Sequence, residues 1–184
     1  MDEARLEESG SGLAARSEGW FVVNVRDSMW LTSEGDKQST GAECTFESRE
    51  VDFPQYGIRL HVLPPGESNG LYHQENQQED FLVLSGECTL LVEGREKTLR
   101  PWDFFHSPAG TEHIFVGAGD QPCVILMAGG RQMPWEVVYP KSELAAKYGA
   151  SADEETSDPD KAYADFEPSR RERPSYWSRL PWAN

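Results

Sequence analysis

The chain has 184 residues, a length that one domain with terminal extensions can fill and that can bury a core without disulfides. Its formal net charge of −15 makes the surface repel phosphate backbones and anionic headgroups, so we exclude nucleic acids and membrane surfaces as partners. No run approaches the roughly 20 apolar residues that span a bilayer, and the acidic start does not resemble a signal peptide. We therefore expect a cytoplasmic protein.

The N-terminal segment, residues 1–18, is polar and charged and holds few apolar side chains. Burial of so little apolar surface does not offset the entropy of ordering, so this segment is predicted to be a flexible tail. The run from Trp20 to Val25 is aromatic and β-branched and predicts a strand, which Trp30 to Thr32 extends after a break. Residues 33–42 indicate a loop.

The centre of the chain, residues 44–131, consists of short apolar runs separated by turn-forming residues. The predicted strands cover residues 58–63, 80–84, 88–92, 97–99, 103–106, 113–116 and 123–128. Turn formers such as Pro64-Pro65-Gly66 and Pro108-Ala109-Gly110 lie between them. Helical periodicity is absent, so the pattern indicates an all-β antiparallel sandwich or barrel.

The three cysteines, Cys44, Cys88 and Cys123, are far apart in the sequence and contain no Cys-x-x-Cys pair. We interpret them as reduced, and Cys88 and Cys123 as packing residues, because they fall in apolar strands.

The C-terminal segment, residues 136–184, differs in composition from the centre. Residues 141–149 predict a short helix, with Ser142 as N-cap and Gly149 as its stop, and residues 151–160 predict an acidic loop. The last stretch, residues 162–184, is polar but contains five aromatic residues: Tyr163, Phe166, Tyr176, Trp177 and Trp182. We expect this aromatic arm to dock either on the barrel of the same chain or on a second subunit.

Three potential metal ligands, His73, Glu75 and Glu79, lie within seven residues beside an apolar strand. Residues two apart in a strand share a face, so His73 and Glu75 are predicted to point the same way. A turn through the polar residues 76–78 can bring Glu79 back beside them. A second segment, residues 102–113, consists of a strand, a Pro-x-Gly turn and then His113. Imidazoles and carboxylates that converge in this way predict a metal site.

These two segments resemble the two motifs of the cupin superfamily. His73, Glu79 and Gly86 match the first motif in type and spacing, and Pro108, Gly110 and His113 match the second. With the flanking strands, the resemblance covers about residues 57–130. It implies a double-stranded β-helix, or jelly-roll barrel, over residues 19–135 with the metal inside its mouth. A short C-terminal helix and extended terminal arms would complete the chain.

The sequence departs from the family pattern at several positions. Glu75 stands where the family usually has a second histidine, Trp102 replaces the first glycine of the second motif, and Gly117 replaces its asparagine. In addition, Gly66 lies one residue farther from His73 than the pattern asks. The resemblance therefore implies His73, Glu79 and His113 as metal ligands and Glu75 as a substituted ligand.

The implied ligands are all nitrogen and oxygen donors, which suit a single divalent ion of zinc, iron(II), manganese or nickel. A second carboxylate adds negative charge and favours hard cations. An alternative for Glu75 is a solvated turn residue, or a carboxylate that orients a ligand histidine through a hydrogen bond. The sequence does not choose among these metals.

Two further histidines have alternative interpretations. His106 is a weak candidate for a catalytic group, because its strand could face the cavity or the core. His61 is interpreted as a structural histidine, with lining of the pocket as the alternative. The phenylalanines at positions 81, 104, 105 and 115 are predicted to be core residues, some of which could form the apolar wall of a ligand pocket.

The leading functional hypothesis is a metal-dependent enzyme that acts on a small organic molecule, of dioxygenase or isomerase type as the family resemblance implies. The alternative is a non-catalytic protein that binds a metal or small ligand, because fold does not fix function. A third hypothesis is an interaction module whose aromatic arm docks on a partner subunit. Barrels of this kind commonly pair, so we expect a homodimer formed through residues 20–25 or the C-terminal arm.

Overall fold

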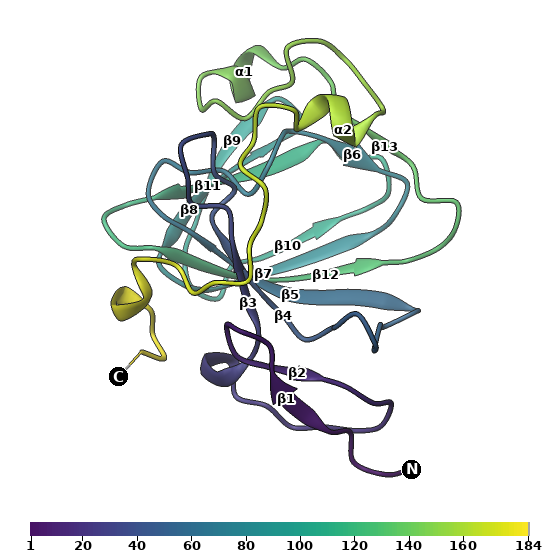
Figure 1. Cartoon of the computed structure of the whole chain (residues 1–184). Coiled ribbons are helices and arrows are strands. Elements are labelled where there is room, and N and C mark those ends of the chain that lie inside the picture. Colours follow the sequence, from purple (N-terminus) through teal and green to yellow (C-terminus); the bar gives the residue numbers. More distant parts are fainter. Residues whose placement is uncertain (184) are drawn as a thin grey trace.

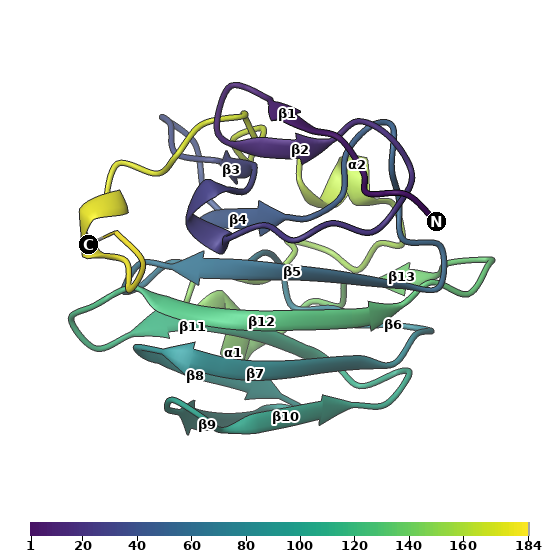
Figure 2. The same ribbon diagram turned by 90° about the horizontal axis from the view of Figure 1, so that it is seen from below.

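The barrel consists of two antiparallel sheets, seen in the computed structural model of the chain (Figure 1), which describes residues 1–183. The larger sheet has six strands in the order β10-β7-β12-β5-β4-β3, and Figure 2 shows them lying in this order across one face. The smaller sheet has the order β11-β8-β9, and two further pairs are β1-β2 and β13-β6. Non-consecutive neighbours in both sheets are typical of a jelly roll, which confirms the predicted all-β jelly-roll barrel.

The elements have the following bounds: β1 (Leu6–Glu8), β2 (Leu13–Ala15), β3 (Trp30–Thr32), β4 (Ala42–Thr45), β5 (Tyr56–Leu63), β6 (Gln74–Glu75), β7 (Glu79–Ser85), β8 (Glu87–Val92), β9 (Arg95–Leu99), β10 (Phe104–Ser107), β11 (His113–Ala118), β12 (Cys123–Gly130), β13 (Val137–Val138), α1 (Glu143–Ala146), α2 (Pro159–Ala162) and 3-10 turns at Val25–Asp27 and Trp177–Arg179. Each predicted central strand is therefore present, within a few residues of its expected bounds. Neither α-helix has the length and apolar character that crossing a bilayer requires, and the same holds for every other helical segment of residues 1–183.

The core between the sheets follows from period-2 alternation along the strands. Phe81 and Val83 of β7 and Ile125 of β12 point inward from the large sheet, and Leu90 and Phe115 meet them from the small sheet. Cysteines 88 and 123 are free and fully buried in the same cluster, and the free Cys44 is also buried, as expected for packing residues. Of the predicted core phenylalanines, the one at position 104 is wrong, because its side chain faces outward and is 63% exposed.

The C-terminal segment covers the outside of both sheets. The helix α1, capped by Ser142, packs on the outer face of the small sheet, where Ala145 contacts the cluster that includes Ile114. The chain then passes to the outer face of the large sheet, where Leu180 is buried in one cluster with Trp30. The aromatic arm therefore docks on the barrel of its own chain.

The N-terminal region differs from its two predictions. Residues 1–18 are predicted to be a flexible tail, but β1 and β2 pair as a short hairpin, and Ala14 and Ala15 are buried. Small side chains let the hairpin lie close to the barrel, so little apolar surface is needed. The strand predicted at Trp20–Val25 is wrong: Trp20 makes an isolated bridge to Glu3, and the chain then enters a 3-10 turn capped by the Asn24 side chain. The capping amide ends extended structure there.

Candidate metal centre

The two site histidines are paired through their backbones. The amide of His73 donates to the carbonyl of His113 at 3.2 Å, and the amide of His113 donates to the carbonyl of His73 at 2.8 Å. This antiparallel bridge joins the segment before β6 to the first residue of β11 and places the ring centroids 5.1 Å apart. Two histidines separated by 40 positions in sequence are therefore neighbours because of one local pairing.

Each imidazole is oriented by a hydrogen bond from its Nδ1 atom. Nδ1 of His73 lies 2.7 Å from the carbonyl oxygen of Leu71, and Nδ1 of His113 lies 3.0 Å from that of Thr111. A carbonyl oxygen can only accept, so each Nδ1 carries the proton, and in the neutral ring the Nε2 lone pair is left free. This is the arrangement that metal-binding histidines use.

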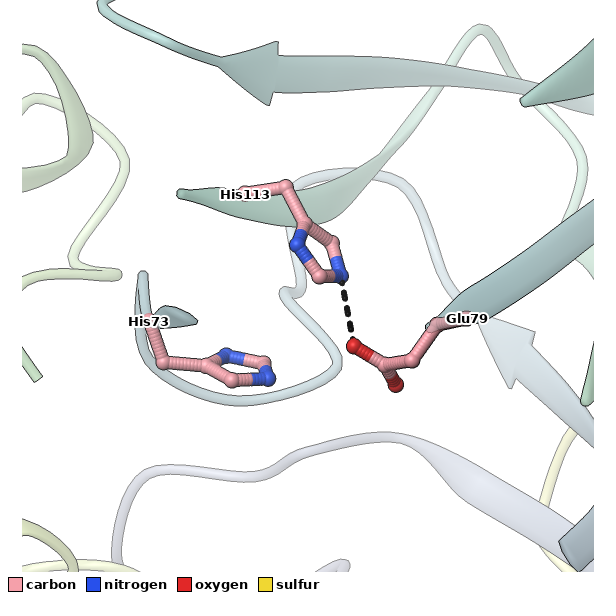
Figure 3. A group of neighbouring side chains, drawn as sticks. All are labelled: His73, Glu79 and His113. Carbon is pink, nitrogen blue, oxygen red and sulfur yellow. Dashed lines mark ion pairs between the residues drawn. The ribbon is translucent and has the colours of Figure 1, made fainter. Parts of the chain in front are cut away.

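Glu79, the first residue of β7, completes the cluster. Its Oε2 lies 3.4 Å from Nε2 of His113, and one ligand atom from each of His73, Glu79 and His113 lies within 4.8 Å of the others. Figure 3 shows the two rings and the carboxylate turned toward one another. Glu79 pairs across the sheet with Gly129, which has no side chain to obstruct the carboxylate. The structure therefore brings together three of the four predicted ligands.

Burial sets the protonation of these groups in the absence of a cation. Burial lowers the pKa of His73, against the opposing effects of the Leu71 hydrogen bond and the Glu75 charge. Burial and the charge of His73 lower the pKa of His113 to about 4. Burial and the charge of Glu75 raise the pKa of Glu79 to about 8. All three groups thus favour their neutral forms near neutral pH, so the cluster itself carries little charge when no cation is bound.

Glu75, the fourth predicted ligand, lies beside the cluster rather than within it. Its Oε1 is 3.8 Å from Nε2 of His73, and its Oε2 accepts a hydrogen bond from the indole of Trp135 at 2.9 Å. One carboxylate oxygen is therefore held by Trp135, while the other faces the histidine. This position fits a ligand, because Glu75 faces the Nε2 atom that would bind the metal. It does not fit a carboxylate that orients His73, because the other ring nitrogen already donates to Leu71.

The loop that carries Trp135 is fixed by two amide side chains from the polar turn after β6. Asn76 donates to the carbonyl of Pro134 at 2.8 Å and accepts from the amide of Glu136 at 3.0 Å. Gln77 donates to the carbonyl of Gln132 at 2.6 Å and accepts from its amide at 3.1 Å. Each side-chain amide thus bonds one backbone carbonyl and one backbone N–H of the loop, as a neighbouring strand would. No pattern in the sequence predicts these hydrogen bonds, because Asn and Gln are common in solvent-exposed turns.

A cavity of about 510 Å³ opens onto the cluster, with His73, Glu75 and Glu79 in its wall. Its volume lies within the range of small-molecule sites. His113 is only 2% exposed and lies behind this wall. Trp135 and Met133, which are 45% and 84% exposed, stand at the rim.

Glu43, Arg59 and His61 line this cavity or the one beside it. The sequence motifs point to neither Glu43 nor Arg59, and His61 is predicted to be structural, with lining of the pocket as the alternative. Arg59 and His61 alternate along β5, and Glu43 of β4 pairs directly with His61. The Glu43 Oε2 atom lies 3.0 Å from both the Arg59 guanidinium and Nε2 of His61. The i, i+2 spacing of Arg59 and His61 in a predicted strand indicates that both side chains lie on one face of the sheet. This spacing is the sequence feature from which their common position could have been predicted. His61 therefore lines the pocket, the alternative that the sequence left open.

The pKa of Glu43 predicts a pH-dependent contribution to stability. Burial alone would raise the pKa, but the hydrogen bond and charge of His61, with Arg59, lower it to about 2 from 4.5. A depressed pKa in the folded state means that this stabilisation is complete above pH 4.5 and is lost as the pH falls toward 2. We expect Glu43→Gln to lose about 1–3 kcal/mol of unfolding free energy at pH 7. The difference from the wild type, measured by urea unfolding, should shrink between pH 4.5 and 3; a constant difference would contradict the assignment.

His106 lies outside the site. It belongs to β10, where Phe105 and Ser107 point inward and His106 points outward. Its Nδ1 lies 2.7 Å from the carboxylate of Asp80, and its side chain is 50% exposed. The structure therefore gives the weak catalytic candidate no place in the cavity.

The donor set of the cluster fits a divalent metal ion. Two imidazole nitrogens and one or two carboxylate oxygens are the ligands that zinc, iron(II), manganese and nickel accept in proteins. The carbonyls of Leu71 and Thr111 hold both rings with Nε2 available, so no rotation is needed before binding.

Comparison with known proteins bears on the family of this fold. Residues 59–129 match the family model described as the cupin domain. Quercetin 2,3-dioxygenase of Bacillus subtilis (strain 168) is 29% identical over 86 residues, which cover 46% of this chain and 26% of that protein. The chain thus spans about a quarter of the length of this curated relative.

Two solved structures illustrate the structural likeness. One, from Silicibacter pomeroyi DSS-3, is described as a sugar phosphate isomerase from a cupin superfamily; it is 26% identical, with a TM-score of 0.47 over 55% of this chain and 65% of that one. The other, a cupin superfamily protein from Desulfitobacterium hafniense DCB-2, is 20% identical, with a TM-score of 0.43 over 49% of this chain and 76% of that one. The family match confirms the resemblance that the two sequence motifs indicate.

Proposed function

The chain carries a cupin domain at residues 59–129, and on this premise we propose that it binds one divalent metal ion through His73, Glu79 and His113. The observation that carries this proposal is the orientation of the two rings. Both Nδ1 atoms donate to backbone carbonyls, so both Nε2 lone pairs are free at the point where the Glu79 carboxylate arrives. Glu75, whose Oε1 lies 3.8 Å from Nε2 of His73, is the proposed fourth ligand.

We further propose that the bound metal serves an enzyme acting on a small organic molecule. Three protein ligands leave coordination positions open, as in catalytic rather than structural sites, and iron(II) or manganese keeps such positions even with Glu75 as a fourth ligand. The cavity of about 510 Å³ gives a small molecule access to the His73 and Glu79 side of the cluster. Dioxygenase and isomerase chemistry are the two candidates, and the short match to the Bacillus subtilis dioxygenase favours neither.

The metal, when bound, would supply Lewis acidity toward an oxygen atom of the substrate. The residues of the chain have separate tasks. Glu75, held by Trp135 at 2.9 Å, keeps a carboxylate oxygen beside His73. Asn76 and Gln77 fix the loop that carries Trp135 and Met133 at the rim of the cavity. Arg59 and His61 line the same cavity, where they can contact the rest of a substrate.

Metal content tests the first proposal. Protein purified without chelator or nickel resin should contain about one equivalent of a divalent transition metal by elemental analysis. Apo protein prepared with a chelator should take up one equivalent in a calorimetric titration. Protein that binds none of zinc, iron(II), manganese or nickel under ample supply would overturn the proposal.

The alternative is a non-catalytic protein with a closed metal site, and cobalt(II) distinguishes the two. An open site should change its visible cobalt spectrum when azide is added, because azide can enter a free coordination position. A site closed by four protein ligands should leave the spectrum unchanged. The second result would favour the binding protein over the enzyme.

Loss of the indole donor at position 135 tests the role of Glu75. We expect Trp135→Phe to weaken metal binding by about tenfold, the lower end of the effect of losing a partner that orients a ligand. Met133→Leu on the same exposed loop is the matched control and should bind as the wild type does. The measurement is a competition titration against a metal-sensitive dye. Equal affinity in the two variants would show that the Trp135 hydrogen bond does not hold Glu75 for the metal.

We also propose that the protein forms a homodimer, since barrels with exposed strands commonly pair. Of the two expected contact regions, residues 20–25 are not a strand and the aromatic arm packs on its own barrel. Sedimentation velocity across a concentration series should give a species of twice the chain mass. A single species with the mass of one chain would contradict this proposal.

A further inference from the structure

A second group of polar residues lines the barrel interior on the same sheet as Glu79 of the metal cluster. In the large sheet Met127 lies between Arg59 and Phe81, and Ile125 lies between His61 and Val83. Arg59 and His61 therefore share the inner face with Phe81 and Val83. Because Glu79 belongs to the same alternating set of β7, the two groups face one interior.

This second group stands where two cavities meet. The cavity of about 510 Å³ reaches the metal cluster, and one of about 400 Å³ extends toward Glu43 and residues 166–169. Both are lined by Arg59, His61, Asn69 and Tyr163, which we call the shared wall. A molecule longer than the first cavity would pass along this wall.

Some polar atoms of the shared wall already have hydrogen-bond partners within the chain, and others do not. Glu43 Oε2 lies 3.0 Å from both Arg59 Nη1 and His61 Nε2. Because an ionised carboxylate only accepts, Nε2 of His61 carries a proton, which leaves Nδ1 as the uncommitted ring nitrogen. His61 is 9% exposed, and its Nδ1 is buried with no hydrogen-bond partner among the described residues. A buried polar nitrogen without a partner is costly, so a ligand that supplies a hydroxyl, which can donate or accept, gains affinity.

Asn69 adds donors to the same wall. Its Oδ1 accepts from the amide of Phe115 at 3.0 Å, which fixes the orientation of the side-chain amide and leaves its NH2 group to donate. Together with the guanidinium of Arg59, the wall presents donors beside an acceptor, the Glu43 carboxylate, and the unpartnered Nδ1 of His61.

This mixture of groups selects for hydroxyls. An anionic ligand would meet the charge of Glu43, and a cationic ligand would meet that of Arg59, while the pair together is neutral. A hydroxyl both donates and accepts, so adjacent hydroxyls can donate to His61 or Glu43 and accept from Arg59 or Asn69. We propose that the shared wall, with Glu43, is a subsite for the hydroxyls of a neutral polyhydroxylated chain. The inference rests on the proposed function, since it names the class of molecule that occupies the cavity beside the metal.

Three six-carbon probes test the subsite: sorbitol with six hydroxyls, 1,6-hexanediol with two, and adipate with two carboxylates. Each is titrated into the ¹⁵N-labelled full chain, in a zinc-loaded and a chelator-treated sample, while the Asn69 side-chain amide and the His61 ring nitrogens are followed by NMR. We expect saturable shifts with sorbitol and not with the other two. Arg59→Met should weaken sorbitol binding about tenfold, the effect of losing one or two hydrogen bonds to a charged donor.

The controls separate the outcomes. Arg100→Met removes a comparable ion pair, that with Glu87 outside the cavity, and should leave sorbitol binding unchanged. Arg59→Lys keeps the charge beside Glu43 and covers the case in which Arg59→Met does not fold. Equal or tighter binding of adipate or hexanediol, or sorbitol binding that Arg59→Met and Arg59→Lys both leave unchanged, would overturn the subsite. Sorbitol shifts in chelator-treated protein that never takes up metal would overturn the metal proposal alone, and metal uptake without sorbitol shifts would overturn the subsite alone.

Discussion

His113→Ala is expected to lose the divalent metal. The substitution removes one of the two imidazole ligands. The side chains of His73 and Glu79 cannot move into its place, because the backbone of each residue is held by pairing with a neighbouring segment. We expect metal affinity to fall by more than about a hundredfold, beyond the 10–100-fold cost of losing a partner that only orients a ligand. Elemental analysis of protein purified under equal metal supply measures the loss.

His106→Ala is the matched control, because it removes a histidine that lies outside the cavity against Asp80. It should retain the wild-type metal content. Misfolding is separated from metal loss by thermal unfolding with and without a chelator. The wild type should gain about 2.7 kcal/mol at a free metal concentration of 100 times its Kd, and His113→Ala, with an affinity at least about a hundredfold lower, should gain no more than about 0.4 kcal/mol. A variant that keeps its metal-dependent stabilisation would remove His113 from the ligand set.

The strands of the barrel centre were predictable because burial on one face forces alternation. Residues 58–63 and 123–128 alternate between the two faces of the sheet, and apolar side chains of both segments are buried in clusters with residues of other strands. Their pairing in β5 and β12 is the consequence. The run at residues 20–25 has the same composition but no neighbouring strand to pair with over its length. Val22 is 82% exposed, so β-branched composition there does not reflect burial.

The ligands were predictable to the extent that each lies in a recognisable motif. His73, Glu79 and His113 stand at motif positions, and the structure brings them within 4.8 Å of one another. The shared wall was not predictable in the same way, because Glu43 approaches His61 only through the pairing of β4 with β5. A single sequence does not contain that register. The Trp135 contact with Glu75 depends in turn on a loop held by Asn76 and Gln77, which local pattern does not reveal.

Trp30→Ala is expected to destabilise the fold by about 3–5 kcal/mol. The reason is that Trp30 is the residue of the barrel on which the aromatic arm packs. Trp30 is fully buried, and its ring centroid lies 5.2 Å from that of Trp177 and 5.3 Å from that of Trp182. Its indole also donates to the carbonyl of Val25 at 3.0 Å. Truncation would leave a cavity between β3 and the arm. The neighbouring side chains can relax into this cavity only in part.

Urea unfolding followed by far-UV circular dichroism measures this effect, with Trp102→Ala as the matched control. Trp102 is 75% exposed, so its removal should change the unfolding free energy by no more than about 0.5 kcal/mol. If the arm instead belonged on a second subunit, the loss in Trp30→Ala would depend on protein concentration, since dimer stability is inseparable from it. A loss that stays the same over a hundredfold dilution places the arm on its own barrel, as the burial of Leu180 beside Trp30 requires.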